Sequence, residues 1–501
     1  MEKSITYWIR KRAYITPNRV ALIGGDREFT YQELLQEINR VAAFLHHKLL
    51  LHKGDRIAIL SQNRIEYFIT YFATAQLGLV AVPLNIRLST AELAYQIEDS
   101  GAKAILFERE LEPLFNQLNQ LVSFESTHTF EDGYTLFQME NPISDSSSPN
   151  DPYIICYTSG TTGKPKGAVL TQENMFWNAL NNQYALDLTS SDNCLVILPL
   201  FHIGGIGLFA FPTFLSGGTV IVPGKFDPKQ VLKIIDDLQV TVMMGVPTIF
   251  NALLNEETFH QTDFTSVRVF CSGGAPCPVE LIQEYHEKGI PLYQGFGMTE
   301  TSPTVFMLSK EDYKRKVGSI GKPVMFCDID LVDDNGKSVK QGEVGELVIR
   351  GGNIFKEYWG LPEKTAEAII NGWFYTGDLA YKDKEGYIYI AGRKKDMIIS
   401  GGENIYPLEV EQVIGEIKEI NEVAVIGIHD EKWGEVPIAI ASIREGQSIL
   451  EEHIQNYCSS KLAKYKVPKR IIFLDELPKN ATGKLDKKLM QQQYNKKVEL
   501  K

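Results

Sequence analysis

Apolar and polar residues alternate along the first 190 positions in a pattern typical of strands followed by helices. Apolar residues recur every three or four positions from Tyr31 to Leu50, which predicts a helix. Thr30 before it and Glu33 three residues on form a capping-box pattern at its start. Short apolar runs at 56–60 and 80–84 predict strands. Strands that alternate with helices indicate a mainly parallel sheet covered by helices.

The same alternation returns over residues 190–310, and from about 325 the pattern becomes hairpin-like β structure. Residues 122–152 are rich in Ser, Asp and Pro and predict a surface linker. We therefore predict an α/β fold with a large multi-sheet N-terminal domain over 1–395. A small α+β C-terminal domain is expected over 396–501.

Composition is that of a globular protein without a nucleic-acid-binding surface. The chain has 501 residues, 44% of them hydrophobic, and a net charge of -12, so no overall basic field attracts nucleic acid. The N-terminus carries no secretory signal. Residues 193–224 lack charge, but their prolines and glycines argue against a transmembrane helix.

The cysteines are scattered, with no C-x-x-C pair, which predicts reduced core thiols and a cytoplasmic protein. They are Cys156, Cys194, Cys271, Cys277, Cys327 and Cys458.

A loop rich in glycine, hydroxyl groups and lysine follows the predicted strand at 154–157. Glycines let successive N–H groups turn toward one anion, and hydroxyls and lysines add donors and charge. This suits a polyphosphate, although the spacing is not that of a Walker A loop. The candidate ligand-binding residues are Thr158, Ser159, Gly160, Thr161, Thr162, Gly163, Lys164 and Lys166.

A second glycine-rich block follows the short strand at 290–293. Its glycines permit a flat ligand to approach the backbone, and a strand-end aromatic ring can cover a purine. Thr299 and Glu300 offer oxygens for phosphate and Mg²⁺. Taken alone, the block is equally well explained as a glycine-rich turn. Its candidate nucleotide-binding residues are Tyr293, Gln294, Gly295, Phe296, Gly297, Met298 and Thr299.

Three further positions are informative only in combination. Asp378, at a strand–loop junction, suits vicinal hydroxyls, but alone it is a turn aspartate. Lys484 alone is a solvated charge near a basic C-terminus. His202, on an apolar stretch, is by itself a core histidine.

Five blocks together resemble the adenylate-forming enzymes, which include acyl-CoA synthetases, aryl-CoA ligases, luciferases and peptide-synthetase adenylation domains. The blocks occur in the family order and span essentially the whole chain. They are Tyr157–Gly167, Tyr293–Glu300, Tyr375–Asp378, Asp396–Pro407 and Pro478–Leu485.

The resemblance implies an ATP site in the large domain. The loop from Thr158 would hold the phosphates, the block from Tyr293 the adenine, and Thr158 with Glu300 would hold Mg²⁺. Gly274 and Ala275 would line the nucleotide site as well.

The same resemblance assigns roles near the C-terminus. Asp378 would bind the ribose with Arg393 close by, and Lys484 would neutralise the reacting carboxylate and α-phosphate. Asp396 would be the hinge of a mobile C-terminal domain. Gly401 and Gly402 would border the tunnel for the pantetheine arm of CoA.

The implied activity is an AMP-forming acid–CoA ligase that uses ATP, CoA and Mg²⁺. His202 would gate the acyl pocket, whose candidate segments at 202–207, 246–249, 272–276 and 295–297 are small and apolar. A medium- or long-chain fatty acid is the favoured substrate. Segments such as Asn404–Pro407 also resemble o-succinylbenzoate–CoA ligases, so that activity and an aryl-CoA ligase stay as alternatives.

Other function classes are less favoured. A carrier-loading adenylation domain would precede a carrier module, a nucleotide sensor would lack Lys484 or Glu300, and an oxidative luciferase would need a special acid. The sequence leaves open the physiological acid, CoA or a carrier protein as acceptor, peripheral membrane contact, and a monomer or homodimer.

Overall fold

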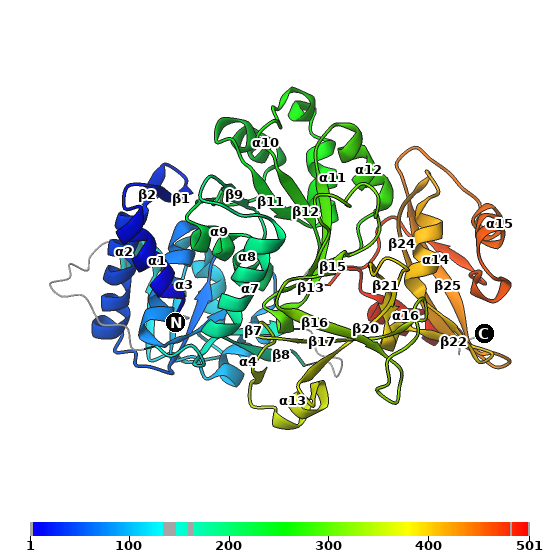
Figure 1. The fold of residues 1–501 in the computed structure, drawn as a ribbon. Coiled ribbons are helices and arrows are strands. Elements are labelled where there is room, and N and C mark those ends of the chain that lie inside the picture. Colours follow the sequence, from blue (N-terminus) through cyan, green and yellow to red (C-terminus); the bar gives the residue numbers. More distant parts are fainter. Residues whose placement is uncertain (1–3, 134–146, 159–163, 481–482, 499–501) are drawn as a thin grey trace. The chain divides into compact units, whose positions relative to one another are not determined.

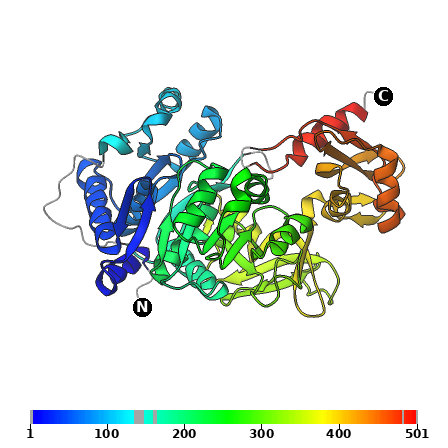
Figure 2. The same cartoon turned by 90° about the horizontal axis from the view of Figure 1, so that it is seen from above.

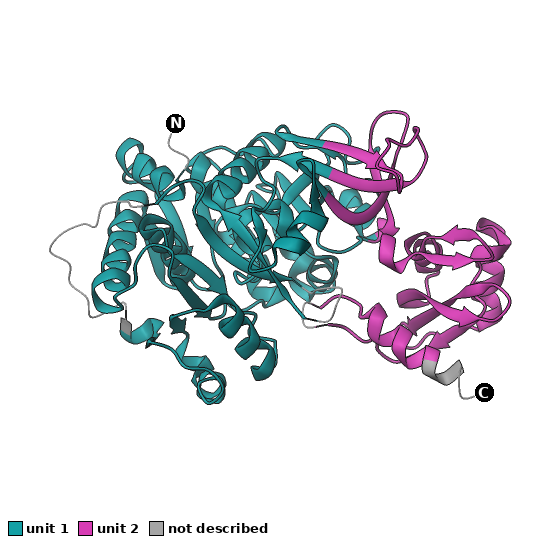
Figure 3. Ribbon diagram, turned by 90° about the horizontal axis from the view of Figure 1, so that it is seen from below, with its two compact units in different colours: residues 1–277, 281–328, 349–374 teal, residues 278–280, 329–348, 375–501 magenta. Residues whose placement is uncertain are grey.

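The computed structural model describes residues 4–133, 147–158, 164–480 and 483–498 (Figure 1). They divide into two compact units (Figure 3). Unit 1 comprises 1–277, 281–328 and 349–374, and unit 2 comprises 278–280, 329–348 and 375–501. The predicted α/β class, with a large N-terminal and a small C-terminal domain, is confirmed. The boundary between residues 395 and 396 stays a prediction.

The first sheet is parallel through its six inner strands, from β13 to β1. In the described chain its strands, from edge to edge, are β15 (Lys322–Pro323), β14 (Thr304–Met307), β13 (Leu292–Gly297), β12 (Val269–Ser272), β11 (Val242–Gly245), β9 (Asn193–Val196), β10 (Thr219–Ile221), β1 (Val20–Gly24) and β2 (Arg27–Thr30).

The second sheet is parallel from β7 to β6 and antiparallel at its other end. Its strands in order are β18 (Glu357–Tyr358), β8 (Lys166–Thr171), β7 (Pro152–Thr158), β4 (Val80–Pro83), β3 (Arg56–Leu60), β5 (Ala104–Phe107) and β6 (Ser126–Thr129). The linker prediction for 122–152 is wrong at β6, because these residues add a parallel strand to β5.

Helices pack between the two large sheets and on their outer faces (Figure 1). Helix α3 (Ile65–Leu77) is buried along its whole length and contacts β1 and β4, as expected of a helix that is apolar on all sides. Around it pack α1 (Ile5–Ile15), α2 (Tyr31–Ala43), α7 (Gln172–Ala185) and α9 (Ala210–Ser216). The outer faces carry α10 (Pro228–Asp237), α11 (Pro247–Leu254) and α12 (Val279–Glu287) on the first sheet, and α4 (Thr90–Ser100) and α5 (Glu112–Leu118) on the second.

The predicted helix over 31–50 starts as expected and ends early. The capping box of Thr30 and Glu33 is present, but the α-helix stops at Ala43 and continues as one π-helical turn over Phe44–Lys48. Shorter helices of unit 1 are α6 (Phe130–Gly133), α8 (Ile203–Gly207) and α13 (Pro362–Ala368). No helix within the described residues is both long and apolar enough to cross a membrane.

Two smaller sheets complete the fold. The third contains β16 (Cys327–Val332), β17 (Gly345–Gly351), β20 (Trp373–Lys382), β19 (Ile369–Ile370) and β21 (Ile388–Arg393). The fourth contains β23 (Glu403–Ile405), β22 (Ile398–Ser400), β25 (Gly434–Ile443), β24 (Ile420–Asp430) and β26 (Ile471–Phe473).

The fourth sheet has a separate hydrophobic core on each face, and Figure 2 shows helices on both of its faces. Helices α14 (Pro407–Gly415) and α15 (Glu451–Lys461) cover one face, and α16 (Lys487–Val498) covers the other through Met490. Pro407 occupies the first position of α14, where its missing N–H costs nothing.

One buried carboxylate joins three separate segments of the first sheet. Asp192, 2% exposed, accepts hydrogen bonds from Arg268 Nη2 at 2.9 Å and Thr241 Oγ1 at 2.8 Å. We expect Asp192→Ala to lower the free energy of unfolding by about 2 kcal/mol, because the Thr241 hydroxyl, the Arg268 guanidinium and the Thr189 N–H lose the charged acceptor that they share. Urea unfolding followed by circular dichroism measures this.

The matched control is Asp328→Ala, which breaks the exposed Asp328–Arg350 pair. We expect a change within about 0.5 kcal/mol there. Equal losses in the two variants would contradict a special role for Asp192.

Candidate functional site

The hairpin of β7 and β8 places Thr158 and Lys166 side by side. Thr158 lies opposite Lys166, and its Oγ1 donates to the Lys166 carbonyl oxygen at 3.5 Å. The ammonium of Lys164 lies 5.6 Å from the centroid of the Tyr95 ring. The other predicted loop residues, Ser159, Gly160, Thr161, Thr162 and Gly163, lie outside the described residues.

Glu300 and Lys166 meet at Tyr358, on the edge strand β18. The Tyr358 hydroxyl donates to Glu300 Oε1 at 2.9 Å, and the Lys166 ammonium lies 3.9 Å from the Tyr358 ring centroid. Glu300 is 8% exposed, in the single turn of 3₁₀ helix at Thr299–Thr301. A carboxylate and an ammonium are therefore held on one aromatic side chain.

The neutral amine form of Lys166 is more favoured in its protein environment than it would be in water. Burial lowers its pKa below the ordinary value, and the charge of Glu300 opposes that shift. A further anion beside the ammonium would stabilise its charged form, so this position is suited to a phosphate.

At the end of β13 the two candidate aromatic rings have different surroundings. Tyr293 is 5% exposed, and its ring lies 4.7 Å from that of Tyr313. Phe296 is half-buried, so it is the ring more accessible to a purine. Gln294 Oε1 accepts a hydrogen bond from the Gly318 N–H at 3.1 Å.

Gly297 lies where no side chain fits, because an added Cβ would lie 1.7 Å from the Pro303 carbonyl oxygen. Glycine is therefore required at this position for packing. Gly295 and Met298 beside it are half-buried, and Thr299 is buried.

One of the four predicted acyl segments, 202–207, borders a small apolar cavity of about 10 Å³, close to the space that one water needs. The segments 246–249, 272–276 and 295–297 do not line it. His202 is half-buried and precedes α8, whose glycines line the cavity. The lining residues are Leu195, Val196, Ile197, Leu198, Gly204, Gly205, Phe209, Ala210 and Met244. Gly274, with a φ of +78°, and Ala275 are exposed after β12.

Unit 2 gathers Asp378, Arg393 and Lys484. Asp378, 3% exposed, lies opposite Arg393 across β20 and β21, and Arg393 Nε lies 2.7 Å from Asp378 Oδ1. Lys484 is an exposed residue, but the protein that surrounds its ammonium removes water from it and so lowers its pKa. The charge of Arg393 lowers it further, and that of Asp378 opposes the shift.

The turn at Gly401 and Gly402 lies beside Trp433. Both glycines have positive φ, at 59° and 88°, and the Gly401 N–H donates to the Trp433 carbonyl oxygen at 2.7 Å. A Cβ at Gly401 would lie 2.7 Å from the Trp433 ring, so the turn requires glycine. Asp396 ends the short 3₁₀ turn Lys394–Asp396.

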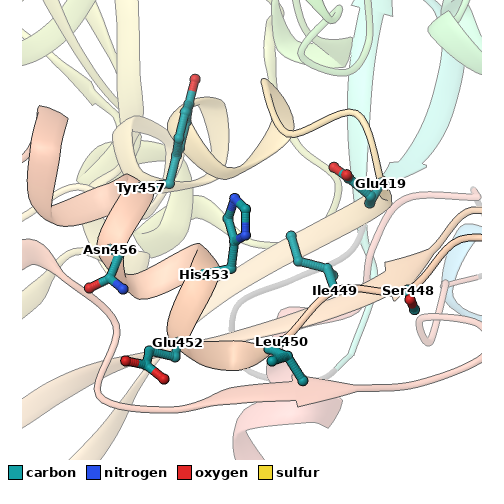
Figure 4. Close-up of a pocket in the computed structure, with 8 residues that line it drawn as sticks. All are labelled: Glu419, Ser448, Ile449, Leu450, Glu452, His453, Asn456 and Tyr457. Atoms are coloured by element: carbon teal, nitrogen blue, oxygen red, sulfur yellow. The ribbon is translucent and has the colours of Figure 1, made fainter.

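An open pocket of unit 2, about 600 Å³, contains none of the predicted site residues (Figure 4). Its lining residues, among them His453 and Tyr457, belong to α15 and nearby loops. Among the residues described, no cluster of three or more His, Cys, Asp or Glu side chains could hold a metal ion. Mg²⁺ usually binds through one or two carboxylates together with waters and substrate phosphates, so Glu300 does not need such a cluster.

Sequence reasoning missed Tyr358, Tyr95 and Asp99. Tyr358 reaches Glu300 through the two-residue strand β18, which is too short to give a periodic signal. Tyr95 and Asp99 lie on α4, about 60 residues before the loop that they contact. No local motif marks such long-range partners.

Two family models match the chain. The AMP-binding enzyme model matches residues 9–359, and the AMP-binding enzyme C-terminal domain model matches residues 409–484.

Similar proteins are CoA ligases. A feruloyl-CoA synthase of Amycolatopsis sp is 39% identical over 95% of this chain and 96% of its own length. A long-chain-fatty-acid–CoA ligase of Mycobacterium tuberculosis is 38% identical over 99% of both chains. The structure of o-succinylbenzoate CoA synthetase from Bacillus subtilis with its acyl-adenylate, OSB-AMP, is 37% identical over 97% of both chains, with a TM-score of 0.89.

The contact between Tyr358 and Glu300 allows a test of the predicted metal site. We expect Tyr358→Phe to raise the Mg²⁺ concentration needed for half-maximal ATP binding about 10-fold, because the Glu300 carboxylate loses the donor that orients it. The ring below Lys166 is kept. Calorimetric titration with ATP at a series of Mg²⁺ concentrations measures this.

Tyr285→Phe is the control, because the Tyr285 hydroxyl donates to the Phe250 carbonyl oxygen in the core of the first sheet. An unchanged Mg²⁺ requirement in Tyr358→Phe would show that Glu300 does not depend on this hydrogen bond.

Proposed function

The chain belongs to the AMP-binding enzyme family and is an ATP-dependent acid–CoA ligase, and we propose that its substrate is a medium- or long-chain fatty acid. The supporting observations are the similarity to a long-chain-fatty-acid–CoA ligase over 99% of both chains and the apolar side chains that surround α8. An apolar wall favours an acid without a second charge, because a buried carboxylate without a cationic partner is costly.

ATP and CoA are consumed, and Mg²⁺ is the cofactor. The carboxylate displaces pyrophosphate from the α-phosphorus of ATP and forms an acyl-AMP. The CoA thiol then attacks the acyl carbon, loses its proton, and displaces AMP to form the thioester. The first step joins two anions, so charge neutralisation and positioning are expected to dominate catalysis.

In unit 1 we assign the phosphates to the Thr158 loop with Lys164 and Lys166. The predicted metal ligands Thr158 and Glu300 present hard oxygens that suit Mg²⁺, which neutralises phosphate charge when bound. Phe296 and Gly297 are assigned to the adenine, beside Gly274 and Ala275. Tyr293 and Gln294 support this strand end through their contacts with Tyr313 and Gly318.

In unit 2 we assign the ribose to Asp378 and Arg393 and the charge neutralisation of the first step to Lys484. The geometry that supports this is the ion pair between Asp378 and Arg393 and the electrostatic coupling of both to Lys484. Gly401 and Gly402 are assigned to the passage for CoA, with a domain boundary and hinge at Asp396. His202 is assigned to the gate of the acyl pocket.

A second candidate substrate is o-succinylbenzoate. The similarity to the Bacillus subtilis synthetase in complex with OSB-AMP favours it. That acid has a second carboxylate, which would require a cation near the apolar cavity. An aryl acid is the third candidate, favoured by the similarity to a feruloyl-CoA synthase.

A cytoplasmic location is proposed from the six cysteines, which are all buried and form no disulfide. Burial raises the pKa of Cys156, Cys194 and Cys327 to about 12, so these thiols are protonated and unreactive. Membrane contact and oligomeric state stay open.

The substrate is tested by AMP release with ATP, CoA and Mg²⁺ over butyrate, octanoate, palmitate, benzoate, ferulate and o-succinylbenzoate. We expect an optimum at octanoate or palmitate, because a longer chain buries more apolar surface. Turnover of o-succinylbenzoate or ferulate alone would replace the fatty acid by that acid.

Lys484→Ala measures the role of the C-terminal lysine. We expect pyrophosphate release to fall at least about 100-fold, because the charge that stabilises the adenylation transition state is lost. Lys488→Ala, an exposed lysine of α16, is the matched control. Equal rates for the two variants would remove Lys484 from the catalytic residues.

A further inference from the structure

Helix α4 contacts both ends of the loop assigned to the ATP phosphates. Before the loop, the Tyr157 hydroxyl donates to Asp99 Oδ2 at 2.7 Å. After it, the Tyr95 hydroxyl donates to the Pro165 carbonyl oxygen at 3.3 Å. Tyr95 and Asp99 are four residues apart, so they share one face of α4. One helical turn therefore holds the residue before the loop and a residue after it.

Asp99 has a second connection to the same hairpin. Its carbonyl oxygen accepts a hydrogen bond from Trp359 Nε1 at 3.0 Å, and the Trp359 N–H donates to the Gly167 carbonyl oxygen at 2.7 Å. Gly167 packs closely against β7, since a Cβ there would lie 2.6 Å from Ile155 Cγ2. The position of the hairpin relative to α4 is thus fixed by several contacts.

The Lys164 side chain is held by a cation–π contact, whereas the backbone of the hairpin is held by hydrogen bonds. Its ammonium lies 5.6 Å from the Tyr95 ring centroid, at the outer limit of a cation–π contact. A cation–π contact at a partly exposed ring is weaker than an ion pair between an ammonium and a phosphate. The Tyr95 ring can therefore hold the Lys164 side chain without preventing its pairing with a phosphate. The hydrogen bond to Pro165 fixes the backbone from which Lys164 projects.

Resting on the ligase function proposed above, we propose that Tyr95 and Asp99 are positioning residues that hold Lys164 and the adjoining ends of β7 and β8 in place for the β- and γ-phosphates of ATP. They touch no substrate and act through Tyr157, Lys164 and Pro165. Their effect is expected only for ligands and steps that involve those two phosphates. ATP binding and acyl-AMP formation depend on them, while AMP binding and thioester formation from acyl-AMP do not.

The test compares ATP with AMP binding by calorimetry in the full chain with Mg²⁺. We expect Asp99→Ala and Tyr95→Phe each to weaken ATP binding about 5- to 10-fold, the effect of one hydrogen bond, and to change AMP binding less than about twofold. Tyr95→Ala also removes the ring below Lys164 and should weaken ATP binding further.

The two half-reactions give a second readout. Pyrophosphate release should slow in these variants, while thioester formation from a supplied acyl-adenylate keeps its rate. The matched control is Thr90→Val on the same helix, whose hydroxyl donates to Gln117 Oε1 at 3.4 Å, away from the loop. It should behave as the unaltered chain.

Equal weakening of ATP and AMP binding, or slowing of both half-reactions, would indicate a general structural defect and overturn the positioning role. Unchanged ATP binding in Asp99→Ala and Tyr95→Ala would also overturn it. Absence of ATP binding by the unaltered chain would overturn the proposed function, and this inference with it.

Discussion

The pairing of β8 with strands on both sides is the constraint on which the arrangement of Lys166, Tyr358 and Glu300 in unit 1 depends. On one side, β7 sets Thr158 opposite Lys166 and Tyr157 opposite Gly167. On the other, β18 sets Tyr358 opposite Ala168, which makes Tyr358 the diagonal neighbour of Lys166. A slip of one residue in either pairing would turn Lys166 or Tyr358 to the wrong face of the sheet. The contact of Lys166, Tyr358 and Glu300 therefore follows from strand register.

In unit 2, strand register also determines which candidate side chains meet. Antiparallel pairing of β20 and β21 sets Asp378 opposite Arg393. The turn before Asp378 is itself fixed by two hydrogen bonds of Thr376. Its Oγ1 donates to the Leu347 carbonyl oxygen at 2.7 Å and accepts from the Asp378 N–H at 3.0 Å. A buried carboxylate whose backbone is fixed in this way and whose Oδ1 is held by Arg393 is suited to a pair of hydroxyls, because little reorganisation is needed on binding.

The sequence predicted the alternation of strands and helices and the motifs at strand ends, because both produce local patterns. The capping box at Thr30 and the proline at the start of α14 are of this kind. Prediction from the sequence failed where the structure of a segment or the contacts of a side chain depend on residues far away in the chain. Strand β6 was assigned to a linker, since only its pairing with β5 makes it a strand. Neither the different burial of Tyr293 and Phe296 nor the hydrogen bond from Tyr358 to Glu300 leaves a local signal.

The charges of the candidate site explain how an acidic chain can hold a polyphosphate. The net charge is -12, and Glu300 adds a further carboxylate next to the lysine assigned to the phosphates. Glu300 alone would repel a phosphate at that position, so its presence is favourable only if a cation lies between the two anions. Lys166 cannot balance both the Glu300 carboxylate and a phosphate. Its ammonium already lies on the Tyr358 ring, and burial lowers its pKa. The arrangement of Glu300, Tyr358 and Lys166 is thus suited to a phosphate ligand that brings its own divalent cation.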